Sequence, residues 1–178
     1  MLNLYLTDLQ SYNEGDLVGK WIKLPLTSFE LSQALSEVLT EGEVISGSDN
    51  HEEYFITDWD WNNYEFYDID EYENIYKLNE ELQTLQYKSD YELKAIAFLV
   101  TEGIAVDIED AITKADDVYI HENKDMTDIA YDLMQDCYQA DKLPSIIANN
   151  IDYESIAQEL EYDGIYYEVG TDIFEYIG

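Results

Sequence analysis

Four aspartates stand at helical intervals in one stretch of the sequence: Asp125, Asp128, Asp132 and Asp136. Positions i, i+3, i+7 and i+11 lie on one face of a helix, and with a rise of about 1.5 Å per residue the carboxylates repeat every ~4.5–6 Å. That interval is close to the separation of successive phosphates along one strand of DNA. For this helix alone the simpler interpretation is a solvated polar face, and a row of phosphate surrogates is the alternative.

A second acidic stretch offers five more carboxylates: Asp58, Asp60, Glu65, Asp68 and Asp70. Its first residues imitate the start of an EF-hand loop, which requires glycine at the sixth position and a bidentate glutamate at the twelfth. Asn63 and Ile69 occupy those positions instead. We therefore expect adventitious binding of Ca²⁺ or Mg²⁺ and no dedicated metal site.

The other reactive residue types give no catalytic signal. His51 and His121 each lack a second histidine at the spacing of a zinc site. Cys137 is the single cysteine, which excludes an internal disulfide, and its position on the apolar face of the aspartate-bearing helix predicts a small core residue. Phosphate-loop, dinucleotide and serine-hydrolase motifs are absent. The sequence thus predicts no catalytic residue, no cofactor and no metal.

The composition is dominated by acidic residues. The 178 residues include 41 Asp and Glu against 8 basic residues, all of them lysine, for a net charge of −33. Binding of nucleic acid through its phosphates needs a basic surface, so it is excluded, and docking on an anionic membrane is disfavoured for the same reason. A hydrophobic content of 46% argues against a disordered acidic tail. We expect a soluble, cytoplasmic protein without a membrane-spanning segment.

The first part of the chain is predicted to be rich in β-structure. Apolar alternation marks strands over residues 2–6 and 18–24, and an aromatic-rich strand is expected over 53–59. Residues 12–16 have the composition of a turn. The capping box Thr27–Glu30 opens a helix expected to end near Leu39, and the glycines and serines after it predict a loop over 41–50.

The remainder is predicted as a helical segment followed by a mixed one. Helices are expected over 75–85, after the capping box Ser89–Glu92, and over 107–114. Beyond them the sequence predicts a strand over 118–121 and a helix over 126–138. A short helix is expected from Pro144, another from Asp152 to Leu160, and a hairpin around Gly170-Thr171.

These patterns predict an α+β fold built as an elongated chain of three small domains. The expected boundaries are 1–70 for a β-rich N-terminal domain, 71–112 for a helical middle domain and 113–178 for a mixed C-terminal domain. Their net charges are −13, −7 and −13. An acidic tail would concentrate its charge in one block, so the negative charge is a property of the whole surface.

Several sequence blocks resemble the ArdA antirestriction family. The most specific is the opening, Leu4-Tyr5-Leu6-Thr7-Asp8-Leu9, followed by Tyr12 to Gly15 and by Leu17 to Pro25. Glu52 to Asp58 is similar to a second recurring block of that family, and Ile75 to Leu85 is similar to the start of its middle domain. The segments from Asp128 to Pro144 and from Asp152 to Glu175 agree in order and spacing, so the resemblance covers almost the whole chain.

The resemblance implies a DNA mimic encoded on mobile elements, which occupies the DNA-binding groove of type I restriction–modification enzymes, formed by their specificity and modification subunits. It also implies an elongated chain that dimerises through its C-terminal domain and brings no catalysis or cofactor. DNA carries one charge per ~1.7 Å of its axis, so 33 charges correspond to about 56 Å of duplex. We expect the nine aspartates and glutamates named above to act as phosphate surrogates. The expected dimer contact uses apolar residues of the C-terminal domain: Ile129, Leu133, Leu143, Ile146 and Ile147.

Three other interpretations remain open. An acidic module that shields a basic partner without imitating DNA would explain the charge, and competition with DNA for one groove separates it from a mimic. An acidic enzyme or a Ca²⁺-dependent protein would show a stoichiometric metal effect on stability. Halophilic adaptation also favours acidic residues, although the abundant aromatic residues argue mildly against it.

Overall fold

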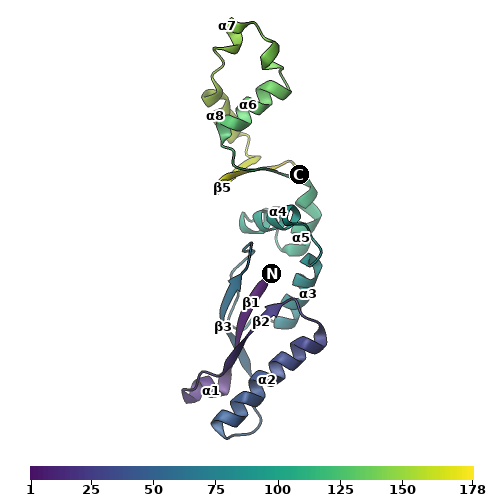
Figure 1. Ribbon diagram of the computed structural model, residues 1–178, viewed down its shortest axis with the longest axis vertical. Helices are drawn as coiled ribbons and strands as arrows, with labels where there is room; N and C mark the ends of the chain where they lie inside the picture. Colours follow the sequence, from purple (N-terminus) through teal and green to yellow (C-terminus); the bar gives the residue numbers. More distant parts are fainter. The chain divides into compact units, whose positions relative to one another are not determined.

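The computed structural model describes all residues, 1–178, as a mixed α+β protein with eight α-helices and two small antiparallel sheets (Figure 1). The chain divides into two compact units, Met1–Ala111 and Ile112–Gly178. The sequence-based prediction placed boundaries after residues 70 and 112. No division occurs near residue 70, so the three-domain arrangement is not confirmed.

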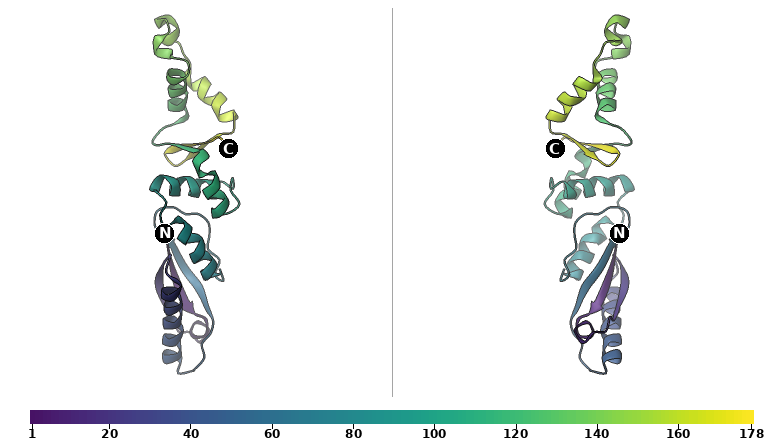
Figure 2. Two further views of the ribbon diagram at one scale, coloured as in Figure 1. Left: turned by 90° about the vertical axis from the view of Figure 1, so that its right-hand side faces the viewer. Right: turned by 90° about the vertical axis from the view of Figure 1, so that its left-hand side faces the viewer.

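The first unit combines a three-stranded sheet with the first five helices. The elements are β1 (Leu2–Asp8), α1 (Leu9–Glu14), β2 (Gly19–Leu24), α2 (Ser28–Ser46), β3 (Tyr54–Trp61), α3 (Ile75–Leu85), α4 (Asp90–Thr101) and α5 (Ile108–Lys114), whose last residues cross into the second unit. The strand order is β2-β1-β3 with both pairs antiparallel. Leu2, Leu4 and Leu6 of the central strand are fully buried, as their alternation predicts. The long helix α2 runs beside the strands (Figure 2).

Residues 71–111 belong to the same unit as the sheet because polar contacts join them to it. The side chain of Asn79 in α3 is buried, and its Oδ1 accepts a hydrogen bond from Leu26 N at 2.7 Å. Its Nδ2 donates to Leu26 O at 2.9 Å, and Ile56 N in β3 donates to Glu71 O at 2.8 Å. If α3 moved away from Leu26, the buried amide of Asn79 would lose its partners, which would cost free energy. These contacts therefore hold α3 against the segment after β2.

Two features of the first unit differ from the sequence-based prediction. Residues 9–14 form a short helix capped by Asp8 and ended by Gly15 in the left-handed conformation, whereas a turn was expected over residues 12–16. Helix α2 continues beyond Leu39 to Ser46, through a segment predicted as a loop. Gly42 is buried there, and an added Cβ would lie 2.7 Å from Asp8 Cγ and 2.8 Å from His51 Nδ1. This glycine therefore serves close packing inside the helix and does not end it.

The second unit is a smaller sheet with helices packed on it. The elements are a 3₁₀ turn (Ala115–Asp117), β4 (Val118–His121), α6 (Met126–Asp136), a 3₁₀ turn (Ala140–Lys142), α7 (Ser145–Ala148), α8 (Tyr153–Tyr162), β5 (Tyr166–Val169) and β6 (Asp172–Tyr176). The strand order is β4-β6-β5, and β5 and β6 form the predicted hairpin.

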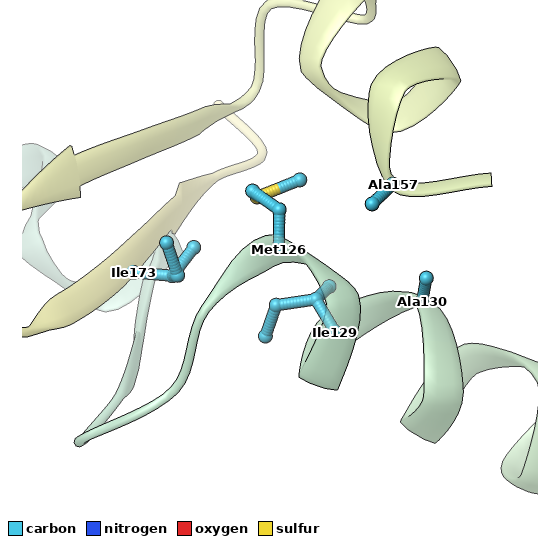
Figure 3. Packing of buried hydrophobic residues seen from close by; sticks show 5 residues of the cluster. All are labelled: Met126, Ile129, Ala130, Ala157 and Ile173. Carbon is cyan, nitrogen blue, oxygen red and sulfur yellow. The ribbon is translucent and has the colours of Figure 1, made fainter. Parts of the chain in front are cut away.

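The core of the second unit lies where α6 meets α8 and β6. The cluster consists of Met126, Ile129, Ala130, Ala157 and Ile173, all at most 4% exposed (Figure 3). The prediction that Cys137 belongs to this core is wrong, because the side chain is exposed. Helix α6 ends at Asp136, and Cys137 caps it, so the apolar stripe does not continue that far.

The capping boxes predicted from sequence are formed. At the start of α4, Ser89 N donates to Glu92 Oε2 at 2.8 Å and Ser89 Oγ donates to the same atom at 2.7 Å, while Lys88 Nζ lies 3.0 Å from Oε1. These contacts lower the pKa of Glu92 from 4.5 to about 2, and the hydrogen bond from the Ser89 backbone has the largest effect.

The Glu92 cap is expected to make stability depend on pH. Because the pKa is lower in the folded chain, the contribution of the cap is complete above pH 4.5 and is lost as the pH falls toward about 2. Replacing Glu92 by glutamine should therefore reduce the urea midpoint near neutral pH, with a difference from the wild type that narrows as the solution is acidified. A direct NMR titration of the Glu92 carboxyl group should show a midpoint near 2. A midpoint at the ordinary glutamate value would contradict the cap.

Candidate functional site

Helix α6 presents the aspartate row predicted from sequence. Asp125, Asp128 and Asp136 are exposed, and the side chain of Asp132 is 41% exposed to solvent. Asp125 is the N-cap: its Oδ1 accepts a hydrogen bond from Asp128 N at 2.9 Å, and Asp128 Oδ2 accepts one from Asp125 N at 3.2 Å. Both carboxylates stabilise the helix start, where negative charge is favoured, and still face solvent.

Lys124 reports the electrostatic field of this row. Its ammonium group forms an ion pair with Asp132. The hydrogen bond to Asp132 raises the pKa of Lys124 above its ordinary value, and the charges of Asp132, Asp128 and Asp136 raise it further. The row therefore stabilises a cation placed beside it. Lys142, the other lysine nearby in sequence, instead donates to Gln139 at 3.0 Å, so one lysine compensates the row.

The aspartate row borders a hollow between α6 and the β5–β6 turn. Asn123, Lys124, Asp125 and Asp128 line it on one side, and Glu168 and Asp172 line it on the other. Asp172 Oδ1 accepts a hydrogen bond from Asn123 N at 2.8 Å, which holds the loop before α6 against the hairpin. The hollow extends the acidic surface beyond the four helical aspartates to two carboxylates that the sequence-based prediction did not include.

The second acidic stretch lies wholly on the surface of the first unit. Asp58 and Asp60 are alternate residues of β3, opposite Tyr5 and Asn3 of β1. The other three, Glu65, Asp68 and Asp70, lie in the connection between β3 and α3. All five are exposed.

Buried aromatic and aliphatic side chains fix the connection that carries these carboxylates. Phe66 and Ile69 are 2% and 3% exposed, so they anchor the segment while the acidic residues between and beside them face solvent. Asp70 Oδ1 also accepts a hydrogen bond from Tyr72 N at 2.8 Å. Five carboxylates are thus displayed by a strand and a segment with a defined backbone.

Three of the five lysines in the first unit are paired with carboxylates of the same chain. Lys20 pairs with Glu37, Lys77 with Glu81 and Lys88 with Glu92, at 2.5, 3.4 and 3.0 Å. The first unit contains 25 acidic residues and 5 lysines, for a net charge of −20, and the second contains 16 and 3, for −13. Both units are therefore strongly negative, and both carry one of the predicted acidic surfaces.

A buried polar cluster in the first unit was not predicted from the sequence. His51 Nδ1 lies 2.9 Å from both Oδ1 and Oδ2 of Asp8, and neither side chain is exposed. Since a carboxylate only accepts hydrogen bonds, Nδ1 is the donor. On the other side of the ring, Nε2 lies 3.1 Å from Ser46 Oγ and 2.9 Å from Ser48 Oγ. Its members come from β1, the end of α2 and the segment before β3, so no local sequence pattern could reveal it.

The order Asp8–His51–Ser48 matches the connectivity of a serine-hydrolase triad, but its surroundings favour a structural role. Gln10 Nε2 donates to Ser48 Oγ at 3.0 Å. Ser46 is the last residue of α2, so the cluster sits at the negative end of the helix dipole, which disfavours an oxyanion. We interpret the cluster as a clamp that holds the end of α2 against β1 and α1.

Ser11 provides a test of the packing beside this clamp. Its side chain is fully buried, and its Oγ has no hydrogen-bond partner. A buried, unsatisfied hydroxyl costs about 1–3 kcal/mol, so replacing Ser11 by alanine is expected to leave the free energy of unfolding unchanged or to raise it. Urea denaturation followed by tryptophan fluorescence measures this effect. A loss of more than about 1 kcal/mol would show that the hydroxyl is satisfied in solution.

None of the helices has both the length and the apolar character of a bilayer-crossing segment. The structure also places no three His, Cys, Asp or Glu side chains where they could together hold a metal ion.

The family model described as antirestriction protein (ArdA) matches residues 4–175, nearly the full length of the chain. The chain belongs to the ArdA family. Membership assigns an antirestriction function, which entails interaction with restriction enzymes, and ArdA proteins are inhibitors rather than enzymes. No curated protein sequence matches this ArdA chain.

Proposed function

We propose that this ArdA-family protein is a DNA mimic that occupies the DNA-binding groove of type I restriction–modification enzymes, formed by their specificity and modification subunits, and so blocks restriction. The aspartate row of α6 is the observation that carries the proposal. Asp128, Asp132 and Asp136 of α6, with Asp125 at its N-cap, have the spacing of one helix face, which a rise of about 1.5 Å per residue converts to a phosphate-like interval. They stabilise a cation beside them, as the raised pKa of Lys124 indicates. A basic groove that binds DNA through lysine and arginine would make the same contacts with this row.

The distribution of charge supports a long contact rather than a single patch. The net charges of −20 and −13 lie on two separately folded units. Matching about 56 Å of duplex requires an elongated chain, because a compact chain of this length has a radius of gyration of only ~16 Å. We accordingly propose that the chain is elongated and acts as three small domains in the cytoplasm of a bacterial host, encoded on a mobile element.

We further propose that the protein is a homodimer joined through the second unit. Ile146 and Ile147 in α7 are 80% and 51% exposed, which makes them available for contact with a second copy. Leu133 and Leu143 are half-buried. Ile129 lies in the core of its own chain at 4% exposure, so it would support such a contact from beneath.

Phage plating tests the proposed function directly. Unmodified phage should plate efficiently on a host with a type I restriction system when this protein is expressed, and poorly when it is not. Restriction that stays unchanged across several type I families would overturn the proposal. Purified enzyme then separates a mimic from a non-mimic acidic module, because only a mimic competes with DNA for the same groove.

Binding to the restriction enzyme is expected to weaken steeply with salt. Proteins that make several phosphate contacts lose orders of magnitude in affinity between about 50 and about 200 mM salt, and we expect this protein to lose at least about tenfold over that range. Displacement of labelled DNA from a type I methyltransferase at several salt concentrations measures the slope. An affinity that stays flat would mean that charge does not govern the contact.

A further inference from the structure

The sheet of the first unit has one covered edge and one open edge. At the β3 edge, Ile56 N donates to Glu71 O, so the chain itself covers part of that strand. At the other edge, β2 pairs with β1 alone, and no other backbone group of the chain bonds to residues 19–24. An open edge strand is a template for an additional strand.

A groove of about 330 Å³ follows this open edge. Trp21, Ile22 and Leu26 line it on the strand side, and Gln33, Ala34 and Glu37 of α2 line it on the helix side. Grooves between an edge strand and a helix bind extended peptides, whose backbone pairs with the strand while alternate side chains point into the groove.

The walls of the groove are fixed before any partner binds. Gly19 at the start of β2 lies so close to β1 that an added Cβ would be 2.4 Å from Leu6 O. At the other end, Asn79 holds both the N–H and the carbonyl of Leu26. Trp21 is 49% exposed, yet its ring packs edge-on against Tyr5 with centroids 5.4 Å apart. Exposed, rigidly held tryptophans are common anchors of protein interfaces.

The charges in the groove select the partner. Glu37 is engaged by Lys20 and Gln33, which lower its pKa, and Glu30 is engaged by the cap residue Thr27. Lys23 is exposed and forms no ion pair, although the chain carries 41 acidic residues. Lys23 is therefore the charged group of this groove that remains available to pair with a carboxylate of a partner.

Pairing of β2 with β2 of a second copy is disfavoured. An antiparallel pair centred between Trp21 and Ile22 would place Lys20 of each copy directly opposite Lys23 of the other. Like charges in that position destabilise a strand pair, and lysine is a common protection against edge-to-edge pairing.

We propose that the groove between β2 and α2 binds an extended segment of a partner protein, which adds a fourth strand to the sheet beside β2. The segment alternates apolar and polar residues and places one carboxylate opposite Lys23. This contact differs in chemistry from the acidic surfaces, since it depends on backbone pairing and on a lysine.

A capped seven-residue peptide of alternating valine and threonine with one central glutamate serves as the probe, added to the ¹⁵N-labelled full chain. We expect amide shifts confined to residues 19–24 and to the α2 groove face, together with slower hydrogen exchange in β2. Lys23→Gln should weaken binding of this peptide about three- to fivefold. It should leave unchanged the binding of a second peptide in which glutamine replaces the central glutamate. Lys77→Gln is the matched control, because Lys77 is an exposed lysine on α3 that does not line the groove.

Three results would overturn the proposal. The first is the absence of shifts in β2 at about 2 mM peptide, the range of weak but specific binding. The second is equal binding of a peptide whose backbone N–H groups are methylated, since strand addition needs those donors. The third is equal weakening by the Lys23 and Lys77 variants. Because the assay contains no restriction enzyme, its outcome is independent of the proposed DNA mimicry.

Discussion

Replacing Asp8 by alanine is expected to lower the free energy of unfolding of the first unit by about 2–4 kcal/mol. The substitution leaves His51 buried without its carboxylate partner, 2.9 Å away in the intact protein. It also removes the N-cap of α1, whose Oδ1 accepts a hydrogen bond from Ser11 N at 2.6 Å; such caps contribute roughly 1 kcal/mol. The three tryptophans, Trp21, Trp59 and Trp61, all lie in the first unit, so their fluorescence in urea reports its unfolding.

Two variants make this result specific. Asp8→Asn keeps one oxygen that can accept hydrogen bonds from both Ser11 N and His51 Nδ1. It should therefore lower the free energy of unfolding distinctly less than alanine does. Asp58→Ala removes an exposed aspartate from the same sheet and should change stability by less than about 0.5 kcal/mol. An Asp8→Ala variant within about 1 kcal/mol of the wild type would contradict the role of this buried pair as a clamp.

Neutralising the nine proposed phosphate surrogates together should nearly abolish inhibition of a type I enzyme. If each exposed charge pair contributes roughly 0.5 kcal/mol, nine amide substitutions remove about 4 kcal/mol, or about a thousand-fold in affinity. Each single substitution should weaken binding by only about twofold. Asparagine at position 125 preserves the N-cap of α6, so the helix stays formed while its charge is lost. The inhibitory concentration in a DNA-cleavage assay measures the series.

The matched control changes the same number of exposed carboxylates elsewhere: Glu14, Asp16, Glu41, Asp49, Glu52, Glu53, Glu102, Glu109 and Glu159. This control removes the same number of negative charges from the protein. We expect it to weaken inhibition less than neutralising the nine proposed phosphate surrogates does. Equal losses would mean that total charge, and not position, governs binding. A single substitution that abolished inhibition would indicate a discrete site and contradict a distributed contact.

Local signals in the sequence were sufficient for much of the fold. The capping boxes at Thr27 and Ser89 correctly start α2 and α4, because both partners of each box lie within four residues. The hairpin around Gly170 was likewise predictable from its turn. The end of α2 could not be predicted in this way, since a glycine such as Gly42 usually destabilises a helix interior. Here the glycine is required by Asp8 and His51, which pack against it from distant parts of the sequence.

The candidate surfaces were predictable in position but not in detail. Helical spacing correctly placed Asp128, Asp132 and Asp136 on α6, whereas the capping role of Asp125 and the ion pair between Lys124 and Asp132 depend on side-chain geometry. The buried pair of Asp8 and His51 joins residues 43 positions apart. No periodic pattern encodes such a contact, because it exists only once the strand and the helix have packed together.

The open edge of β2 gives the large negative charge a further consequence for colloidal behaviour. Proteins usually hide or shorten an edge strand because neighbouring copies can pair along it and aggregate. With a net charge of −33 on every copy, mutual repulsion keeps copies apart before their edges can meet. This repulsion adds to the protection that Lys20 and Lys23 already give the edge, so the strand is tolerated at high concentration without a covering segment.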